Sequence, residues 1–403
     1  MARVTEQQRI LVVGAGMAGV RTAVGLRERG WRGRISLLGA ETHRPYDRPP
    51  LSKALLLGTA DGSAFDVDFE GLGIELLLGR HAVALRPAER AVVTAEGPEP
   101  YDRLVLATGA EPVALPGTEG LPDVHLLRTL DDAAALRPVL EQRRDVVVVG
   151  AGWIGAEFAT AAREAGCAVT VVEAADRPLA GALPAEVAAR TAAWYEEAGV
   201  RLLTGAAVAS VAPGEVVLAD GTGLTAGAVV VGIGARPATG WLAGSGVELG
   251  PDREVLADDR LRTSVPGVWA VGDCASFPSA RYGTRLLVHH WDNAMQGPAT
   301  AAANVLGGDE VYDPVPYFWS EQFGRFVQYA GHHAPGDAAV HRGDPDGAAW
   351  SVCWLRADGT LSGLLAVDRP RDLVQGRRLM ERGAALDPER AADPSVQLKN
   401  AAL

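Results

Sequence analysis

The chain has 403 residues, of which 48% are hydrophobic and 22% charged, and its formal net charge at pH 7 is −12. A chain of this length exceeds one ordinary hydrophobic core, so we expect two or three domains. The negative charge argues against nucleic acid or an anionic membrane as a partner, because both would repel the protein. The sequence contains no bilayer-spanning apolar run and no signal-peptide pattern, so we expect a cytoplasmic protein.

The three cysteines, Cys167, Cys274 and Cys353, lie far apart and form no Cys-x-x-Cys motif. This spacing argues against an iron–sulfur cluster or a zinc site held by the chain's own cysteines. We therefore predict no metal site.

An approximate internal repeat is the strongest feature of the sequence. The segment RILVVGAGMAGVRTAVGLRERG begins at Arg9, and DVVVVGAGWIGAEFATAAREAG begins at Asp145. Each starts with a β-branched run and continues into an alanine-rich amphipathic stretch, which predicts a buried parallel strand, a turn and a helix. The turns carry two G-x-G-x-x-G patterns, formed by Gly14, Gly16 and Gly19 and by Gly150, Gly152 and Gly155.

Each glycine of this pattern has a separate physical task. The first makes the turn, the second lets the backbone approach a pyrophosphate, and the third lets the helix pack closely on the strand. The pyrophosphate then lies at the positive end of the helix dipole. One such pattern can be a plain turn, but two between a strand and a helix predict two dinucleotide sites.

Acidic residues follow the next strand of each unit. Glu173 comes about twenty residues after Gly150, where a carboxylate hydrogen-bonds a ribose 2′-hydroxyl. A carboxylate would repel a 2′-phosphate, so NADH is favoured over NADPH. In the first unit Gly39 and Ala40 follow the strand, and Glu41 is the first acid and the candidate for the adenosine ribose. An exposed acid after a strand is the alternative interpretation.

Three further segments read as strands that end in glycine. They are YDRLVLATGAEP (101–112), AGAVVVGIGARP (226–237) and TSVPGVWAVGDCAS (263–276). The first two would let the chain cross between domains beside a cofactor, and the second contains Gly234. In the third, Asp273 suits a hydrogen bond to the ribityl chain of a flavin, although Gly-Asp after a strand can also be a plain turn.

In this order the motifs resemble the flavin-dependent pyridine nucleotide oxidoreductases. Within them the chain is similar to the NADH-dependent ferredoxin reductases that serve cytochromes P450 and ring-hydroxylating dioxygenases. The resemblance extends over nearly the whole chain and includes RPYDRPPLSK, LRTLDDA, HWDNAMQ and FWSEQFG. It implies an α/β fold with two Rossmann-like dinucleotide-binding domains and a C-terminal α+β domain. The implied boundaries are 1–115 and 240–310 for FAD, 116–239 for NAD and 311–403 for the C-terminal domain.

The resemblance also implies where the cofactors bind. The implied FAD contacts are Gly14, Ala15, Gly16, Gly19, Arg48, Lys53, Val83, Ala107, Arg128, Asp273 and Trp291. The predicted NADH contacts are Gly150, Gly152, Gly155, Glu173 and Gly234.

The segment PYDRPPLSKALL (45–56) contains no cysteine. Disulfide reductases of the superfamily carry redox cysteines after the first nucleotide unit, where this chain offers Arg48, Ser52 and Lys53. The resemblance implies that Lys53 lies beside the flavin N5 and pairs with Glu157, and these two are the catalytic candidates. The alternative is a surface lysine and a helix-face glutamate that never meet.

Other residues allow two interpretations each. His289 stands where the family often has an acid, and it either alters the flavin environment or is a structural histidine. Trp319 resembles a tryptophan at the flavin edge but can equally be a buried aromatic. A helix with Arg371, Arg377, Arg378 and Arg382 either offers a positive face to an acidic ferredoxin or is an ordinary solvated face.

The function implied by the resemblance is electron transfer from NADH through FAD to a [2Fe–2S] ferredoxin that supplies a cytochrome P450 or an oxygenase. An NADH oxidase or a rubredoxin reductase on the same fold is one alternative. An NADH-sensing redox-signalling flavoprotein is another. We expect a monomer or weak dimer with neither nucleic acid nor membrane as a partner.

Overall fold

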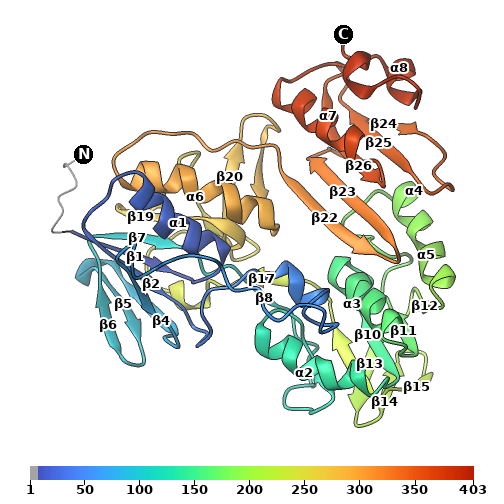
Figure 1. The fold of residues 1–403 in the computed structure, drawn as a ribbon, viewed down its shortest axis with the longest axis horizontal. Helices are drawn as coiled ribbons and strands as arrows, with labels where there is room; N and C mark the ends of the chain where they lie inside the picture. Colours follow the sequence, from blue (N-terminus) through green and yellow to red (C-terminus); the bar gives the residue numbers. More distant parts are fainter. Residues whose placement is uncertain (1–7) are drawn as a thin grey trace. The chain divides into compact units, whose positions relative to one another are not determined.

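The computed structural model describes residues 8–403, which form two compact units (Figure 1). The first unit contains the chain up to Asp47 together with 64–111 and 236–318. The second contains 48–63, 112–235 and 319–403. The chain crosses between the units after residues 47, 63, 111, 235 and 318, and the crossings at 111 and 235 fall in two short paired strands, β8 (Ala110–Pro112) and β17 (Ala235–Pro237).

A five-stranded parallel sheet with the order β19-β7-β1-β2-β3 forms the centre of the first unit. Its strands are β1 (Arg9–Val13), β2 (Arg34–Leu38), β3 (Ile74–Leu77), β7 (Arg103–Leu106) and β19 (Val268–Ala270). Helices α1 (Met17–Glu28) and α6 (Trp291–Val305) pack together over a core that includes Ile10, Val12 and Val105. The β1 residues are buried on both faces because a second core, with Leu11 and Val13, lies on the other side.

Two small sheets complete the first unit. One contains β4 (Ala82–Arg86), β5 (Ala91–Thr94) and β6 (Gly97–Pro100), and the other contains β18 (Val255–Leu256), β20 (Ala275–Ser279) and β21 (Thr284–Leu287). The short 3₁₀ segments of this unit are Pro87–Glu89, Gly240–Leu242 and Gly272–Cys274.

The second unit repeats the same architecture in a parallel sheet with the order β12-β11-β10-β16-β9. Its strands are β9 (Val124–His125), β10 (Val146–Val149), β11 (Val169–Val172), β12 (Arg201–Leu203) and β16 (Ala228–Val231). The helices are α2 (Leu130–Glu141), α3 (Trp153–Glu164), α4 (Ala185–Ala188) and α5 (Ala192–Glu197), with 3₁₀ turns at Pro49–Ser52 and Ala189–Thr191. A small antiparallel sheet contains β13 (Val208–Ala212), β14 (Glu215–Leu218) and β15 (Gly223–Thr225).

The C-terminal part of the second unit is a five-stranded sheet with the order β22-β23-β26-β25-β24. Its strands are β22 (Tyr317–Gln322), β23 (Arg325–Gly331), β24 (Ala338–Arg342), β25 (Trp350–Leu355) and β26 (Leu361–Val367). They are followed by α7 (Pro370–Glu381), α8 (Pro388–Ala392) and a 3₁₀ turn at Leu398–Ala401.

The predicted α/β class, with two Rossmann-like folds and a C-terminal α+β domain, is confirmed. The compact units do not follow the predicted domain boundaries one for one. The second unit combines the sheets of the predicted NAD and C-terminal domains and also includes 48–63. The domain boundaries themselves stay a prediction.

A buried ion pair fastens the C-terminal segment to this sheet. Arg342 on β24 is 1% exposed, and its Nε donates to Asp372 Oδ2 on α7 at 2.9 Å. Its other nitrogens donate to the backbone oxygens of Ala391, Asp393 and Val396. A buried guanidinium is tolerated only when its donors are satisfied, so this one side chain ties the segment after α7 to the sheet.

We expect Asp372→Ala to lower the free energy of unfolding by about 3–5 kcal/mol, because it leaves the Arg342 charge buried without its carboxylate. Asp346→Ala is the matched control, since Asp346 pairs with Arg190 at 2.6 Å but is 81% exposed. That change should cost no more than about 1 kcal/mol. Denaturant titration of the two variants checks the difference, and equal losses would contradict it.

Candidate functional site

The first glycine turn joins β1 to α1, and its three glycines differ in what surrounds them. Gly14 has φ +112°, and a Cβ there would lie 2.0 Å from the Ala107 oxygen. A Cβ on Gly19 would lie 1.7 Å from the Gly14 oxygen, so neither position tolerates a side chain. A Cβ on Gly16 would meet nothing within 4 Å. The turn is therefore closed at its ends and open in the middle, which is the arrangement that a pyrophosphate needs.

The start of α1 also suits an anion. Gly16 is the N-cap residue, and it provides no side-chain hydrogen bond to the first turn, which contains no acidic residue. The amides at the helix start therefore keep their hydrogen-bonding capacity and the positive end of the dipole. A phosphate group fits there without further rearrangement.

The second glycine turn, between β10 and α3, has the same geometry. Gly150 has φ +103° and its Cβ would lie 2.4 Å from the Gly232 oxygen, while a Cβ on Gly155 would lie 2.1 Å from the Gly150 oxygen. The nearest atom to a Cβ on Gly152 is 3.9 Å away, and α3 has no side-chain cap either. Gly234, predicted to contact the same cofactor, also faces open space. Both turns thus fit a dinucleotide.

The two acidic residues predicted for ribose binding are anchored differently. Glu173, after β11, accepts hydrogen bonds from the backbone amides of Ala151 at 2.7 Å and Ala175 at 2.9 Å. Its carboxylate is thereby fixed beside the second glycine turn. Glu41, after β2, accepts a hydrogen bond from the Tyr46 hydroxyl at 2.5 Å. Sequence reasoning did not identify Tyr46, because its pairing with Glu41 depends on the path of the loop.

Further predicted flavin contacts of the first unit line the same sheet edge. Gly14, Ala107 and Asp273 follow the adjacent strands β1, β7 and β19, so they lie side by side at the carboxyl ends of the strands. Trp291 begins α6, and its Nε1 donates to Asp47 Oδ1 at 2.8 Å. Val83 lies apart from these on β4, with 51% of its surface exposed.

The remaining predicted FAD contacts, Arg48, Lys53 and Arg128, belong to the second unit. Arg48 Nη1 donates to the backbone oxygen of Arg128 at 2.5 Å. The amide of Arg128 donates to Asp132 Oδ2 at 2.9 Å, just before α2 begins. Two cationic residues distant in the sequence are therefore neighbours.

Glu157 on α3 is the centre of a buried polar cluster. It is 6% exposed, and its Oε2 accepts from Lys53 Nζ at 2.7 Å and from the Ser52 hydroxyl at 2.5 Å. Its Oε1 accepts from the Ser320 hydroxyl on β22 at 2.8 Å. The structure thus brings Lys53 and Glu157 into direct contact. Sequence reasoning missed Ser320, which lies inside FWSEQFG without any signal that links it to α3.

His290, the N-cap residue of α6, stacks on Phe318 with ring centroids 4.1 Å apart. Desolvation lowers the pKa of His290 to about 4, although the negative charge of Asp273 opposes this shift. His290 is therefore neutral at pH 7 and brings no positive charge to this part of the unit.

The three cysteines are buried and unpaired. Burial raises the pKa of each thiol, that of Cys353 to about 12. Because a thiol relay requires thiolates, none of the three is suited to that chemistry.

The remaining candidates from the sequence lie on β22 and on or just after α7. Trp319 on β22 is half-buried, and Arg371, Arg378 and Arg382 are exposed on or just after α7, while Arg377 pairs with Glu381.

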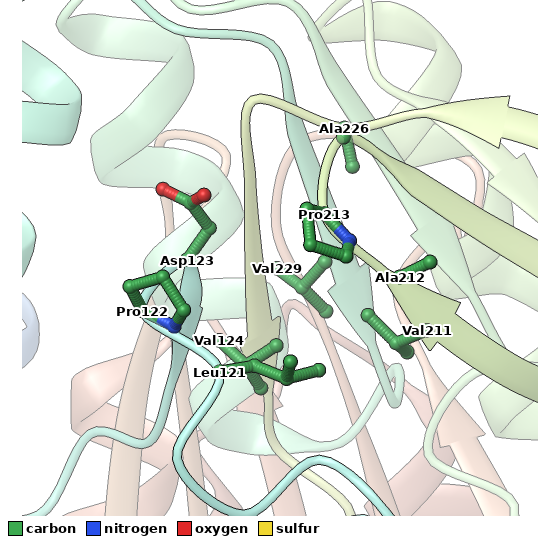
Figure 2. Close-up of a pocket in the computed structure, with 10 residues that line it drawn as sticks. Leu121, Pro122, Asp123, Val124, Val211, Ala212, Pro213, Ala226 and Val229 are labelled. Atoms are coloured by element: carbon green, nitrogen blue, oxygen red, sulfur yellow. The ribbon is translucent and has the colours of Figure 1, made fainter.

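A pocket lies between the 121–124 segment and β13 (Figure 2), but its lining is apolar except for Asp123, which pairs with Arg144. None of the predicted site residues lines it.

Residues 8–403 contain neither a membrane-spanning helix nor a cluster of metal ligands. None of the helices described there is long and apolar enough to cross a bilayer. Nor does that range contain a group of three or more His, Cys, Asp or Glu residues able to hold a metal ion.

Comparison with known proteins covers both parts of the chain. Residues 8–298 match the pyridine nucleotide-disulphide oxidoreductase family, and residues 317–402 match the reductase C-terminal family. Rhodocoxin reductase of Rhodococcus erythropolis is 38% identical, over 97% of this chain and 93% of its own. The ferredoxin–NAD(+) reductase component of the p-cumate 2,3-dioxygenase system of Pseudomonas putida is 36% identical, over 98% of each chain.

A solved structure agrees with these relatives. The reductase chain in the covalent putidaredoxin reductase–putidaredoxin complex superimposes with a TM-score of 0.94 at 32% identity, over 98% of both chains. The resemblance inferred from the sequence motifs is confirmed. This chain belongs to the pyridine nucleotide-disulphide oxidoreductase family and carries a reductase C-terminal domain.

Proposed function

We propose that this chain is an FAD-dependent reductase that takes electrons from NADH and passes them to a [2Fe–2S] ferredoxin serving a cytochrome P450 or an oxygenase. The observation that carries the proposal is the Lys53–Glu157 contact, which joins the segment after the first glycine turn to the helix of the second. The relatives support the direction of electron flow, because one is named as a ferredoxin–NAD(+) reductase component of a dioxygenase system.

The two glycine turns divide the cofactors between them. The turn with Gly14, Ala15, Gly16 and Gly19 holds FAD, and the turn with Gly150, Gly152 and Gly155 holds NADH. Bound FAD supplies the chemistry that accepts a hydride and releases single electrons. Glu41 and Glu173 bind the two riboses, and the remaining FAD contacts are Arg48, Lys53, Val83, Ala107, Arg128, Asp273 and Trp291. Gly234 leaves room beside NADH.

Lys53 and Glu157 supply a fixed electric field. The Lys53 side chain is 22% exposed, so its ammonium can face a ligand while Glu157 compensates its charge from the buried side. A positive charge held beside the electron-accepting ring favours the state in which the ring is electron-rich. The extra hydrogen bonds to Glu157 offset part of the cost of burying a carboxylate.

The partner site for ferredoxin is proposed on the face of α7. Arg371 and Arg378 on this helix and Arg382 directly after it are exposed, on a chain whose net charge is −12. A local positive face would steer an acidic ferredoxin despite the overall charge.

The glycine turns give a paired prediction. Gly16 and Gly152 have ordinary extended backbone angles and open space at Cβ, so valine should fold at either position. Gly16→Val should lower the affinity for FAD at least tenfold, or about 1.4 kcal/mol, because its side chain occupies the pyrophosphate space. Gly152→Val should retain FAD but lose NADH affinity to a similar extent. Gly181→Val, at an exposed glycine with no neighbour within 4 Å, is the control. Flavin absorbance measures the affinity for FAD, and NADH titration measures the affinity for NADH. Loss of the same cofactor in both variants would contradict the assignment of one cofactor to each turn.

The function itself is tested by NADH-driven cytochrome c reduction with and without a panel of [2Fe–2S] ferredoxins. We expect strong stimulation by at least one ferredoxin. Lys53→Met and Glu157→Gln should each slow flavin reduction by NADH about tenfold to a hundredfold, since they remove a preorganised charge. If no ferredoxin stimulates while NADH still bleaches the flavin, the acceptor is wrong and the oxidase or signalling alternatives take its place.

The choice between NADH and NADPH depends on the Glu173 charge. Glu173→Gln should lower the ratio of kcat/KM for NADH over NADPH by about tenfold, because the 2′-phosphate is no longer repelled. Glu41→Gln, the equivalent change after β2, should leave the ratio unchanged. Steady-state kinetics with both nucleotides provide the measurement, and an unchanged ratio in Glu173→Gln would exclude this role.

A further inference from the structure

A chain of buried hydrogen bonds extends from the C-terminal sheet to Glu157. Gln322 Nε2 donates to the Ser320 hydroxyl oxygen at 3.1 Å, and that hydroxyl donates to Glu157 Oε1 at 2.8 Å. Ser320 and Gln322 are each 1% exposed, and they lie two residues apart on β22, hence on the same face of the strand. Ser320 is part of the reductase C-terminal domain, whereas Glu157 is part of the pyridine nucleotide domain.

The two carboxylate oxygens of Glu157 have different partners. Lys53 and Ser52 both donate to Oε2, and Ser320 donates to Oε1. Because the last torsion of a glutamate is soft, contacts at one oxygen alone leave the carboxylate plane poorly fixed. The Ser320 hydroxyl has a single proton, which it uses to donate a hydrogen bond to Glu157. Its oxygen can therefore only accept a hydrogen bond from the side-chain amide of Gln322. This order of donors fixes all three side chains.

The β22–β23 turn holds Ser320 at a defined place against the helices of the second unit. The amide of Phe323 donates to the Thr160 hydroxyl on α3 at 3.0 Å, and its ring packs on Tyr195 of α5 with centroids 4.6 Å apart. Arg325 pairs with Glu197 at 2.5 Å and lies 4.9 Å from the ring centroid of Trp194. These contacts anchor the turn to α3 and α5. The Ser320 hydroxyl is therefore held at a fixed position beside Glu157.

We propose that Ser320 is a positioning residue for the reductase: its hydroxyl orients the Glu157 carboxylate and, through it, the Lys53 ammonium. The C-terminal domain thereby sets the geometry of the charge that assists hydride transfer. This inference rests on the proposed function, in which Lys53 lies beside the flavin ring. Its experiment therefore includes one measurement that does not depend on the flavin reaction.

The kinetic test compares Ser320→Ala with Ser362→Ala in the FAD-loaded protein. Ser362 on β26 is also 1% exposed, and its hydroxyl also donates to a carboxylate, Asp337 at 2.5 Å, but it does not contact Glu157. In stopped-flow reduction by NADH, Ser320→Ala should lower the limiting rate constant about tenfold with an unchanged NADH dissociation constant, as loss of a hydrogen bond to a charged group predicts. Ser362→Ala should stay within about twofold of the unchanged protein.

The second measurement uses the fact that the sequence contains only two lysines, Lys53 and Lys399. An amine-acylating reagent reacts with a lysine whose side chain can leave its ion pair, and a poorly oriented carboxylate holds the Lys53 side chain less firmly. Peptide mass spectrometry should show Lys53 acylated at least about threefold faster in Ser320→Ala, with the exposed Lys399 as internal reference, since a threefold change needs only a small part of one hydrogen bond. Ser362→Ala should leave both rates unchanged.

The two readouts separate the possible failures. Faster acylation of Lys53 with unchanged flavin reduction would keep the positioning of the pair but overturn the proposed role of the pair in hydride transfer. Equal acylation in both variants would overturn the positioning role of Ser320. If Ser320→Ala does not fold, Ser320→Cys retains most of the volume with a weaker donor and should give a smaller change in the same direction.

Discussion

A buried carboxylate is the constraint on which the second unit depends. Glu157 is almost fully enclosed, and a charge in such a place is stable only with a countercharge and further hydrogen-bond donors. The chain supplies these from two distant segments, the one after the first glycine turn and strand β22. Meeting the needs of one carboxylate therefore fixes three parts of the chain against each other.

The glycine turns could be predicted because their requirements are local. A glycine at φ above +100°, next to a neighbouring carbonyl, has no substitute, so the pattern appears directly in the sequence. The same holds for the strand and helix on either side, whose burial follows the β-branched run and the alanine-rich stretch. The position of Glu173 could also be predicted, since it directly follows the strand that pairs with β10.

Contacts between distant residues could not be predicted in this way. Lys53 and Glu157 are separated by 104 residues, and only the resemblance to a family indicated that they meet. Ser320 is 163 residues from Glu157, and the local sequence around a serine in a strand does not indicate which distant residue it will contact. The grouping of residues 48–63 with the second unit could not be predicted from the sequence either. It results from packing on α3 rather than from any local conformational preference of the segment.

The buried Arg342 has a consequence for how the protein is made. Its strand is synthesised well before the carbonyls of Ala391, Asp393 and Val396 that satisfy its guanidinium. Since domains fold during synthesis from the N-terminus onward, the two dinucleotide folds can form while the C-terminal sheet still has an uncompensated charge to bury. The edge of that sheet formed by β24 can be completed only after Val396 has been synthesised. The burial of Arg342 therefore waits for residues that are synthesised long after both glycine turns.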